Sequence, residues 1–447
     1  MTFEQVKKAL SAAARRTGLK DYEIYWESEE NLTVETLKDT VSAFSSGNSR
    51  GVCFRCIVGG HMGSASGELM TDEALENMVR QAISNAEAID TDDQPILFSG
   101  SPHYEKVTSP EPVLAEPSVL RHLALDLQKA TYAQSEKVGD GTQSYMMSAV
   151  CEIGLANSTG LSLSERFGMT GGFVSAIVRR GEEARDAFYA MQGSDMEELA
   201  DLPRTAVSRA LDRFGAVPVK SGKYDVVFSG EVFREFLETY SPIFSAKQAQ
   251  LGLSLLAGKE GSQIASPCVT LIDDPLRAGS PIQTSFDGEG VATSRRAVVE
   301  NGVLKTLFYD LTTAARAGRE STGNGHRGGY ASPVAISPYH FCLAAGTDRQ
   351  EDLFAAAPDG IYLTKCKGFH AGANAVTGDF SIDSEGFCIR NGKRAEPICG
   401  FTIAGNFFDL LKAVERIGDT VLWQVPTGLT CFGSPDLLVR NISVAGE

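Results

Sequence analysis

The chain has 447 residues, a length that predicts two to three domains with enough apolar material for a core in each. Hydrophobic residues make up 43% and charged residues 22%, which is usual for globular proteins. The formal charge is −16 and the basic residues form no run, which disfavours direct binding to nucleic acid.

The first residues lack the basic and apolar stretches of an export signal. No apolar run approaches the roughly 18 residues that a membrane-spanning helix needs. The nine cysteines are irregularly spaced, which favours free thiols in a reducing compartment. We therefore expect a cytoplasmic protein that does not contact a membrane.

Residues 1–100 are expected to form an N-terminal α+β domain. Thr2 and Gln5 form a capping-box pattern that begins one helix, and a second amphipathic helix is predicted after Thr71. Between the two helices, strands are predicted at residues 22–26, 32–37, 52–58 and 61–66.

Residues 101–222 are expected to form a central α+β domain that opens with a proline-bearing linker at 101–117. The predicted elements that follow are a helix at 118–133, strands at 144–155, 161–167 and 173–179, and a helix at 195–214 with a kink at Pro203.

Residues 223–447 are expected to form a β-rich C-terminal domain. Asn301-Gly302 and Asn391-Gly392 lie between apolar runs, which is the strongest short-range pattern for a hairpin. The fold class predicted for the whole chain is α+β. N-terminal α/β units with mixed sheets and helices precede a strand-rich antiparallel domain, which is barrel-like or a sandwich.

The spacing of the histidines and cysteines gives little support for a metal or redox motif built from neighbouring residues. No two histidines lie within six residues of each other, so no helix or hairpin presents a local pair of zinc ligands, although a site built from distant residues stays open. Cys53 and Cys56 lie in a predicted strand, where residues three apart point to opposite faces. Cys366 and His370 are four residues apart but lack a second ligand pair. The histidines are His61, His103, His122, His326, His340 and His370.

Two further segments have ordinary interpretations. Residues 323–329 are dense in glycine but lack the Gly-Lys-Ser/Thr ending of a phosphate loop, and they either line a groove or form a long turn. Residues 229–242 predict an amphipathic helix that Ser229 caps and Pro242 ends. Its polar face places Arg234 and Glu238 as an i,i+4 pair.

Several short segments along nearly the whole chain form a specific pattern, which includes residues 51–57 in the N-terminal part. In the C-terminal half the segments are Asp287-Gly288-Glu289-Gly290-Val291, Val299-Glu300-Asn301-Gly302-Val303-Leu304, Ser321-Thr322-Gly323-Asn324-Gly325, Val376-Thr377-Gly378-Asp379-Phe380-Ser381, Glu385-Gly386-Phe387, Thr402-Ile403-Ala404-Gly405-Asn406 and Ile417-Gly418-Asp419. With these segments the chain resembles the TldD/PmbA family, historically described as modulators of DNA gyrase. The resemblance is most specific in the C-terminal half.

In this family, TldD-type subunits carry a His-Glu-x-x-x-His helix that forms a zinc site with a cysteine near the C-terminus. The resemblance places this motif on residues 237–242, where Leu237 and Pro242 replace the histidines. Glu238 keeps the glutamate and Cys431 matches the cysteine, so two of four zinc positions stay empty. We therefore expect no catalytic residue, metal ligand or cofactor in this chain, and a buried free thiol at Cys431.

This pattern is that of the PmbA kind of subunit, also called TldE. The resemblance implies a non-catalytic subunit of an intracellular metallopeptidase that degrades or matures peptides, in a heterodimer with a zinc-bearing TldD-type partner. It also implies a cavity that binds unfolded peptide by strand addition. The residues expected to line this cavity are Gly323, Asn324, Gly325, Thr377 and Gly378.

Two alternatives remain open. One is a homodimeric peptide-binding or chaperone-like protein without catalysis. The other, which the lack of a paired histidine makes weaker, is a metal-independent enzyme that uses Cys431 or another thiol. In every case the negative charge indicates that any link to DNA is indirect.

Overall fold

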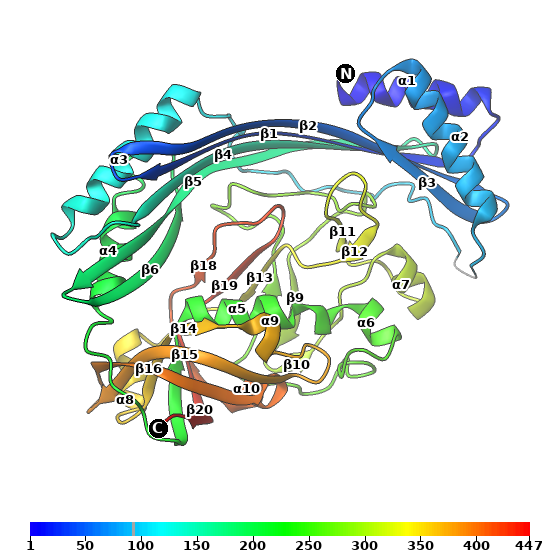
Figure 1. Cartoon of the computed structure of the whole chain (residues 1–447). Helices are drawn as coiled ribbons and strands as arrows, with labels where there is room; N and C mark the ends of the chain where they lie inside the picture. The colour runs from blue at the N-terminus through cyan, green and yellow to red at the C-terminus, as the bar shows by residue number, and fades with distance from the viewer. Residues whose placement is uncertain (92–93) are drawn as a thin grey trace.

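A long antiparallel sheet formed by the first half of the chain arches over the C-terminal half (Figure 1). The structure is a computed structural model and describes residues 1–91 and 94–447. The strand order of this sheet is β3-β2-β1-β4-β5-β6, and the pairing of β1 with β4 joins strands from residues 1–100 and 101–222. The strands are β1 (Tyr22–Leu37), β2 (Thr40–Val58), β3 (His61–Gly67), β4 (Gln143–Asn157), β5 (Ser162–Arg180) and β6 (Glu183–Gln192).

Helices cover the outer face of this sheet, at both of its ends (Figure 1). Ile24 and Trp26 of β1 pack against one pair of helices, whereas Leu32 and Val34 pack against the other pair. Tyr25, with the opposite parity, faces the C-terminal half, as the two-residue period of a strand requires. The helices are α1 (Phe3–Arg16), α2 (Asp72–Ala88), α3 (Pro117–Ala133) and α4 (Asp201–Leu211). None of the helices in the described part of the chain has the length and apolar content to cross a membrane.

The strands are longer than the sequence patterns predict. The strands expected at 161–167 and 173–179 are one strand, β5, and β6 was not predicted. Glycine interrupts the apolar pattern of β5 because the neighbouring strand comes close: a Cβ on Gly172 would lie 2.4 Å from the carbonyl oxygen of Tyr145.

The prediction of a kinked helix over 195–214 is wrong. The helix α4 begins only at Asp201, so Pro203 lies in its first turn, where a missing backbone N–H costs no intrahelical hydrogen bond. The capping box at Thr2 is confirmed, and so is the start of α2 directly after Thr71. The Thr71 side chain also caps α2 by accepting the N–H of Ala74.

The C-terminal half contains a closed five-stranded barrel, which confirms the α+β class and the barrel-like domain. The sheet order is β16-β15-β14-β7-β20-β17, and an additional pairing of β16 with β20 closes the barrel. Most pairs are antiparallel, but β7 and β14 run parallel. The strands are β7 (Gly222–Phe228), β14 (Ile361–Lys367), β15 (Asp379–Arg390), β16 (Lys393–Asn406), β17 (Val414–Ile417) and β20 (Leu437–Ala445).

A second C-terminal sheet has the order β10-β9-β8-β13-β19-β18, and β11 pairs with β12 in a separate ribbon. Both predicted Asn-Gly hairpins are confirmed: Asn301 and Asn391 have φ angles of 49° and 51°, which type I′ turns require. The strands are β8 (Leu271–Asp273), β9 (Arg296–Glu300), β10 (Val303–Leu304), β11 (Gly325–Arg327), β12 (Val334–Ile336), β13 (His340–Leu343), β18 (Leu422–Trp423) and β19 (Cys431–Ser434). The helices of this half are α5 (Gly230–Tyr240), α6 (Ala246–Gln250), α7 (Leu311–Ala317), α8 (Gln350–Ala356), α9 (Phe369–Gly372) and α10 (Phe407–Ala413), with the 3-10 turn η1 (Ser241–Phe244).

Buried charges connect the arched sheet to the C-terminal half. Arg327 of β11 donates from Nη2 to Oε1 of Glu23 on β1 at 2.7 Å, and the two side chains are 1% and 2% exposed. The same oxygen of Glu23 accepts a hydrogen bond from Nε of Arg55 at 2.9 Å. Arg327 also donates from Nε to the carbonyl oxygen of Gly288 and stacks 4.5 Å over the ring of Tyr25. These partners satisfy a guanidinium that would be costly to bury alone.

Two buried carboxyl groups lie beside this ion pair. Asp287 accepts three backbone N–H groups, from Gly325, Glu289 and Val291, at 2.8 to 2.9 Å. Glu289 accepts the N–H of Leu311 at 2.8 Å. Burial raises the pKa of both carboxyl groups, and repulsion by Asp287 raises that of Glu289 further.

We expect Glu289→Gln to alter how stability depends on pH. The unfolded chain releases the Glu289 proton near its ordinary pKa of 4.5, whereas the folded chain holds it to higher pH, so the wild type loses stability as pH rises. The variant lacks this loss. Relative to wild type it gains about 1.4 kcal/mol per unit of pKa shift between pH 5 and pH 8.

Denaturant unfolding at both pH values measures this difference. Glu320→Gln is the control, because Glu320 is exposed on the surface. A stability difference between Glu289→Gln and wild type that is equal at pH 5 and pH 8 would contradict the interpretation.

Candidate functional site

The segment that the resemblance assigns to the zinc motif forms α5 and the turn η1. Ser229 caps α5 as predicted, by accepting the N–H of Val232 at 3.3 Å. The predicted ion pair between Arg234 and Glu238 is wrong, because no nitrogen–oxygen contact of 4 Å or less joins their side chains. The helix ends at Tyr240, and Pro242 lies in η1.

The side chains at the four motif positions have different surroundings. Leu237 is fully buried in the C-terminal core, together with Phe233 and Phe236 of the same helix face. Glu238 and Pro242 are exposed. Cys431 is fully buried on β19, which packs against α5, and it lies within the electrostatic range of Arg234 and Glu238. The structure therefore places Cys431 beside α5, whereas the Leu237 side chain is part of the hydrophobic core.

The Cys431 side chain has the chemistry of a protonated thiol. Its Sγ donates to the carbonyl oxygen of Gln424 at 3.2 Å, and burial raises its pKa to about 11. His340 is its register partner on β13, a neighbour that sequence spacing does not reveal. The imidazole of His340 is engaged elsewhere: Nδ1 donates to the carbonyl oxygen of Asp274 at 2.8 Å, and Nε2 lies 3.2 Å from the hydroxyl of Ser280.

These residues do not fit a zinc ion. Leu237 and Pro242 offer no lone pair, and the Cys431 thiol keeps its proton in a hydrogen bond to a carbonyl oxygen. Within residues 1–91 and 94–447, no group of three His, Cys, Asp or Glu side chains lies close enough together to hold a metal ion.

The other sulfur and histidine candidates are separated as well. Cys53 packs into the core beneath the arched sheet, whereas Cys56 packs against the helices on its outer face, which confirms the opposite orientations predicted for a strand. Cys366 is buried beside the hydroxyl of Ser384, and His370 is exposed on α9. All nine cysteines lie in described residues and are free.

The glycine-rich segments expected to line a peptide cavity occupy two different environments. Gly323, Asn324 and Gly325 are buried, and Asn324 donates from its amide nitrogen to Asp273 at 2.8 Å. Thr377 is exposed in a turn before β15, and Gly378 has a φ of 84° in the same turn. Neither segment lines the cavities described next.

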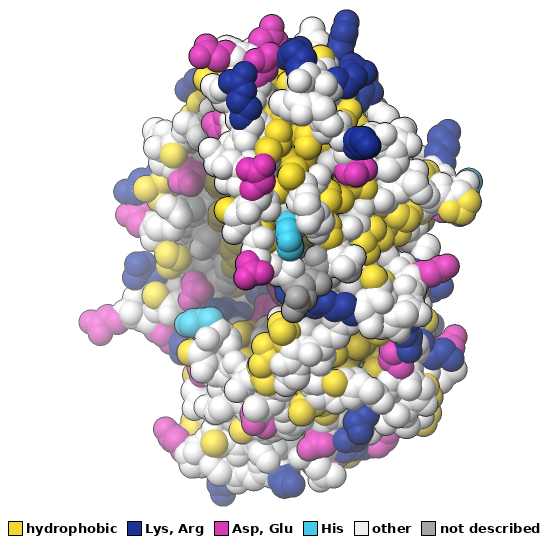
Figure 2. All heavy atoms as spheres, turned by 90° about the vertical axis from the view of Figure 1, so that its right-hand side faces the viewer, with side chains coloured by type: hydrophobic (Ala, Val, Ile, Leu, Met, Phe, Trp, Pro, Cys, Tyr) yellow, Lys and Arg dark blue, Asp and Glu magenta, His cyan; other side chains and the backbone are white. Residues whose placement is uncertain are grey.

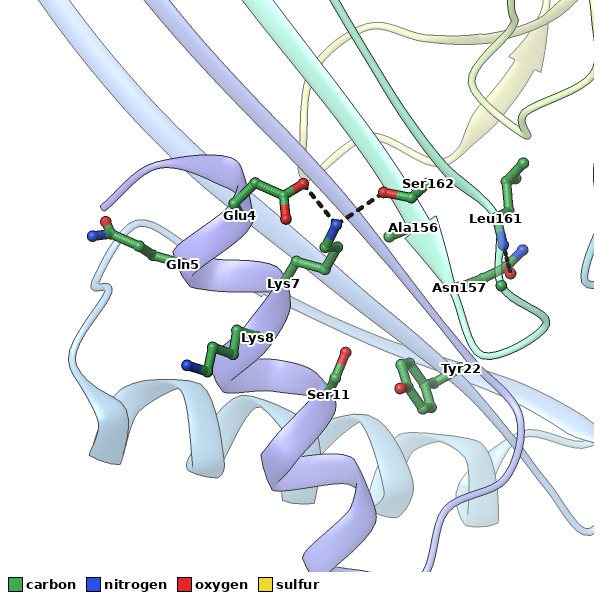
Figure 3. Close-up of a pocket in the computed structure, with 11 residues that line it drawn as sticks. Glu4, Gln5, Lys7, Lys8, Ser11, Tyr22, Ala156, Asn157, Leu161 and Ser162 are labelled. Carbon is green, nitrogen blue, oxygen red and sulfur yellow. Dashed lines mark hydrogen bonds and ion pairs between the residues drawn. The ribbon is translucent and has the colours of Figure 1, made fainter.

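One cavity opens where α1 meets the β4–β5 turn (Figure 3). Its volume is about 630 Å³, and Lys7 is its central cation. Figure 3 shows Lys7 held by Glu4, at 2.6 Å, and by the hydroxyl of Ser162, at 3.0 Å. Because its main cation is already paired within the chain, this cavity offers little for a ligand.

A second cavity, of about 470 Å³, lies along the polar face of α5. Sequence patterns could not reveal it, because its walls come from β6 and α4 in the first half of the chain and from α5, β14, β15 and β16 in the second. It contains two side chains of α5, Arg234 and Glu235, which flank the motif positions in sequence. We call it the α5 cavity.

Replacing Leu237 tests whether this position is packing or a site remnant. We expect Leu237→Ala to cost about 2–5 kcal/mol of stability, because the truncation leaves a void in a fully buried core. Glu238→Ala, one residue further on the exposed side, should change stability by no more than about 0.5 kcal/mol. Denaturant unfolding measures both values, and equal costs would show that Leu237 is not a core residue.

Cys431 should be the slower of two cysteines toward a thiol reagent. The thiolate is the reactive species, so its burial and raised pKa predict alkylation by iodoacetamide on the order of a hundredfold slower than at exposed Cys268. Mass spectrometry of peptides after timed labelling measures both rates, and urea-unfolded protein provides equal access as a control. Rapid labelling of Cys431 in the folded protein would support a reactive thiol instead.

Comparison with known proteins gives consistent results along the chain. Models of the PmbA/TldA metallopeptidase family match residues 22–86 as domain 1, 105–214 as the central domain and 221–446 as the C-terminal domain. A metalloprotease of Methanothermobacter thermautotrophicus is 28% identical over 90% of each chain. The metalloprotease PmbA of Escherichia coli O157:H7 is 25% identical over 60% of this chain and 56% of its own.

Solved structures share the fold over the full length. A Thermotoga maritima protein described as a modulator of a DNA gyrase superposes with a TM-score of 0.89 and 27% identity, covering 99% of this chain and all of its own. TldE from Thermococcus kodakarensis has the same fold, with a TM-score of 0.88 and 22% identity, over 98% of this chain and all of its own. From these matches and the segments quoted above, the chain belongs to the PmbA/TldD metallopeptidase family.

Proposed function

We propose that this chain is the non-catalytic, metal-free subunit of an intracellular metallopeptidase of the TldD–TldE type, which degrades or matures peptides together with a zinc-bearing partner. The observation that carries the proposal is the pair of side chains at the histidine positions of the family motif. Leu237 offers only a buried aliphatic group, and the ring nitrogen of Pro242 is part of the peptide bond. Neither side chain can therefore bind zinc.

The remaining motif residues support the same role. Glu238 would act as a base on zinc-bound water, and without zinc no bound water reaches a pKa near 7. Cys431 is a buried hydrogen-bond donor with no imidazole directed at it, which disfavours a thiol nucleophile. The relatives named as metalloproteases support a role in proteolysis.

Exposed apolar groups support the existence of a protein partner. Leu251, Leu253 and Leu255 follow α6 and are 60%, 43% and 56% exposed. Figure 2 shows the face of the molecule that carries α6. Hydrophobic side chains gather in the upper and in the lower part of this face. Such patches are typical of surfaces that another molecule covers. The free cysteines are consistent with a reducing compartment, and the net charge of −16 favours an indirect link to DNA.

The purified chain alone should contain no stoichiometric zinc and should not cleave unfolded casein in a chelator-sensitive manner. Elemental analysis by mass spectrometry and a fluorescent casein assay measure both properties. The complex isolated from the native host is the positive control, and it should contain zinc and cleave casein. Stoichiometric zinc together with chelator-sensitive cleavage by the lone chain would overturn the proposal.

Affinity capture of the tagged chain from its native host identifies the assembly. Recovery of a paralogue with a His-Glu-x-x-x-His helix supports the heterodimer. Recovery of this chain alone, with self-association in solution, favours the homodimeric peptide-binding alternative instead.

A further inference from the structure

The α5 cavity is positively charged although the chain carries a net charge of −16. Five basic and three acidic side chains line it, among a total of 41 basic and 57 acidic residues in the chain. A cavity whose lining has an excess of one charge, on a protein of the opposite net charge, favours ligands that the rest of the surface repels. The basic residues of the lining are Arg209, Arg213, Arg234, Lys365 and Arg394.

Most of these cations already have partners. Arg209 forms two hydrogen bonds with the carboxylate of Glu231, at 2.6 and 2.8 Å. Arg394 pairs with Asp212 at 2.9 Å. The other two pair more loosely, Lys365 with Asp186 at 3.4 Å and Arg213 with Glu385 at 3.5 Å.

Arg234 is different, because its guanidinium makes no hydrogen bond or ion pair with any described residue. It projects from the middle of α5, so a rigid element holds it at the cavity wall. A guanidinium presents two parallel N–H groups that match a planar carboxylate. One such fork without a partner fits one carboxylate, whereas a phosphate dianion needs more unpaired positive charge than Arg234 supplies.

The neighbouring Glu235 forms no ion pair or hydrogen bond with Arg234. It also lines the cavity and has no hydrogen-bond partner among the described residues. Burial raises its pKa to about 7, even though Arg234 and Lys365 favour its charged form, while Glu231 and Glu238 disfavour it. At or below neutral pH, its protonated carboxyl group can donate a hydrogen bond to a bound carboxylate.

Apolar groups lie next to these charges. Phe188 of β6 and Leu422 of β18 line the same cavity and are 58% and 37% exposed. Phe387 and Tyr362 add aromatic surface from the barrel. A cavity of about 470 Å³ with apolar walls and few oriented polar groups has the size and composition of a small-molecule site.

We propose that the α5 cavity binds a carboxylate that stands next to an apolar group, with the Arg234 guanidinium as its anchor and with Phe188 and Leu422 contacting the apolar group. The C-terminal residue of a peptide and a simple carboxylic acid both carry this chemistry. The inference concerns binding by this chain alone and holds whether or not a catalytic partner exists.

Titration calorimetry on the full-length chain at pH 6.5 tests the site. The probes are N-acetyl-leucyl-leucine with a free carboxylate, the same dipeptide as its C-terminal amide, hexanoate and inorganic phosphate. The free acid should bind at least tenfold more tightly than the amide. Weaker hexanoate binding assigns the site to a peptide end, and equal hexanoate binding assigns it to a simple carboxylic acid.

The variants locate the binding. Arg234→Gln should weaken binding of the free acid at least tenfold, whereas Arg121→Gln, which removes the same charge from an exposed position on α3, should not change it. Glu235→Gln should keep binding at pH 6.5 and remove the loss of affinity that the wild type shows as pH rises to 8. Thermal unfolding verifies that each variant is folded.

Several results would overturn the proposal. They are an absence of binding by any probe, equal affinity for the acid and the amide, tighter binding of phosphate than of either carboxylate, and an unchanged affinity in folded Arg234→Gln. None of these results bears on whether the chain contains zinc or cleaves peptides, so the proposed function is tested separately.

Discussion

The buried contact between Arg327 and Glu23 is the constraint on which the arrangement of the two halves depends. An unpaired guanidinium at this depth would be strongly unfavourable, so β11 has to meet the concave side of β1 at one position. Gly51 of β2 is required nearby, because a Cβ there would lie 2.1 Å from the ring of Tyr330. The glycine-rich segment around β11 is therefore a docking element between the halves, and this docking brings β6 and α4 over α5 to form the α5 cavity.

The same principle explains why leucine suits position 237 in a chain without a metal site there. A single imidazole left at position 237, without zinc and without a hydrogen-bond partner, would bury an unsatisfied polar group in the core. Leucine instead packs with Phe233 and Phe236 and contributes to the hydrophobic stabilisation of the barrel. The Cys431 thiol needs no metal to satisfy its S–H group, because it donates to the carbonyl oxygen of Gln424.

Local patterns in the sequence predicted the elements that local physics determines. The capping box at Thr2 and the Asn-Gly turns at Asn301 and Asn391 depend on neighbouring residues only, and all three are confirmed. The sequence patterns did not predict the full length of β5. The glycine at position 172 is required by the close backbone of β4, a strand that the residues around Gly172 in sequence do not reveal. For the same reason the sequence did not predict the buried pair Asp287 and Glu289 or the unpaired guanidinium of Arg234. The surroundings of all three side chains are set by residues that are distant in sequence.

The two faces of α5 separate packing from ligand chemistry. The face with Leu237 lies in the barrel core, where an aliphatic side chain in place of histidine costs nothing in polar satisfaction. The face with Arg234 and Glu235 lines the α5 cavity. The aliphatic side chain of the first face therefore leaves the donors of the second face unchanged. The proposed carboxylate site uses the face of α5 that carries Arg234 and Glu235, and it does not require a metal ligand at position 237.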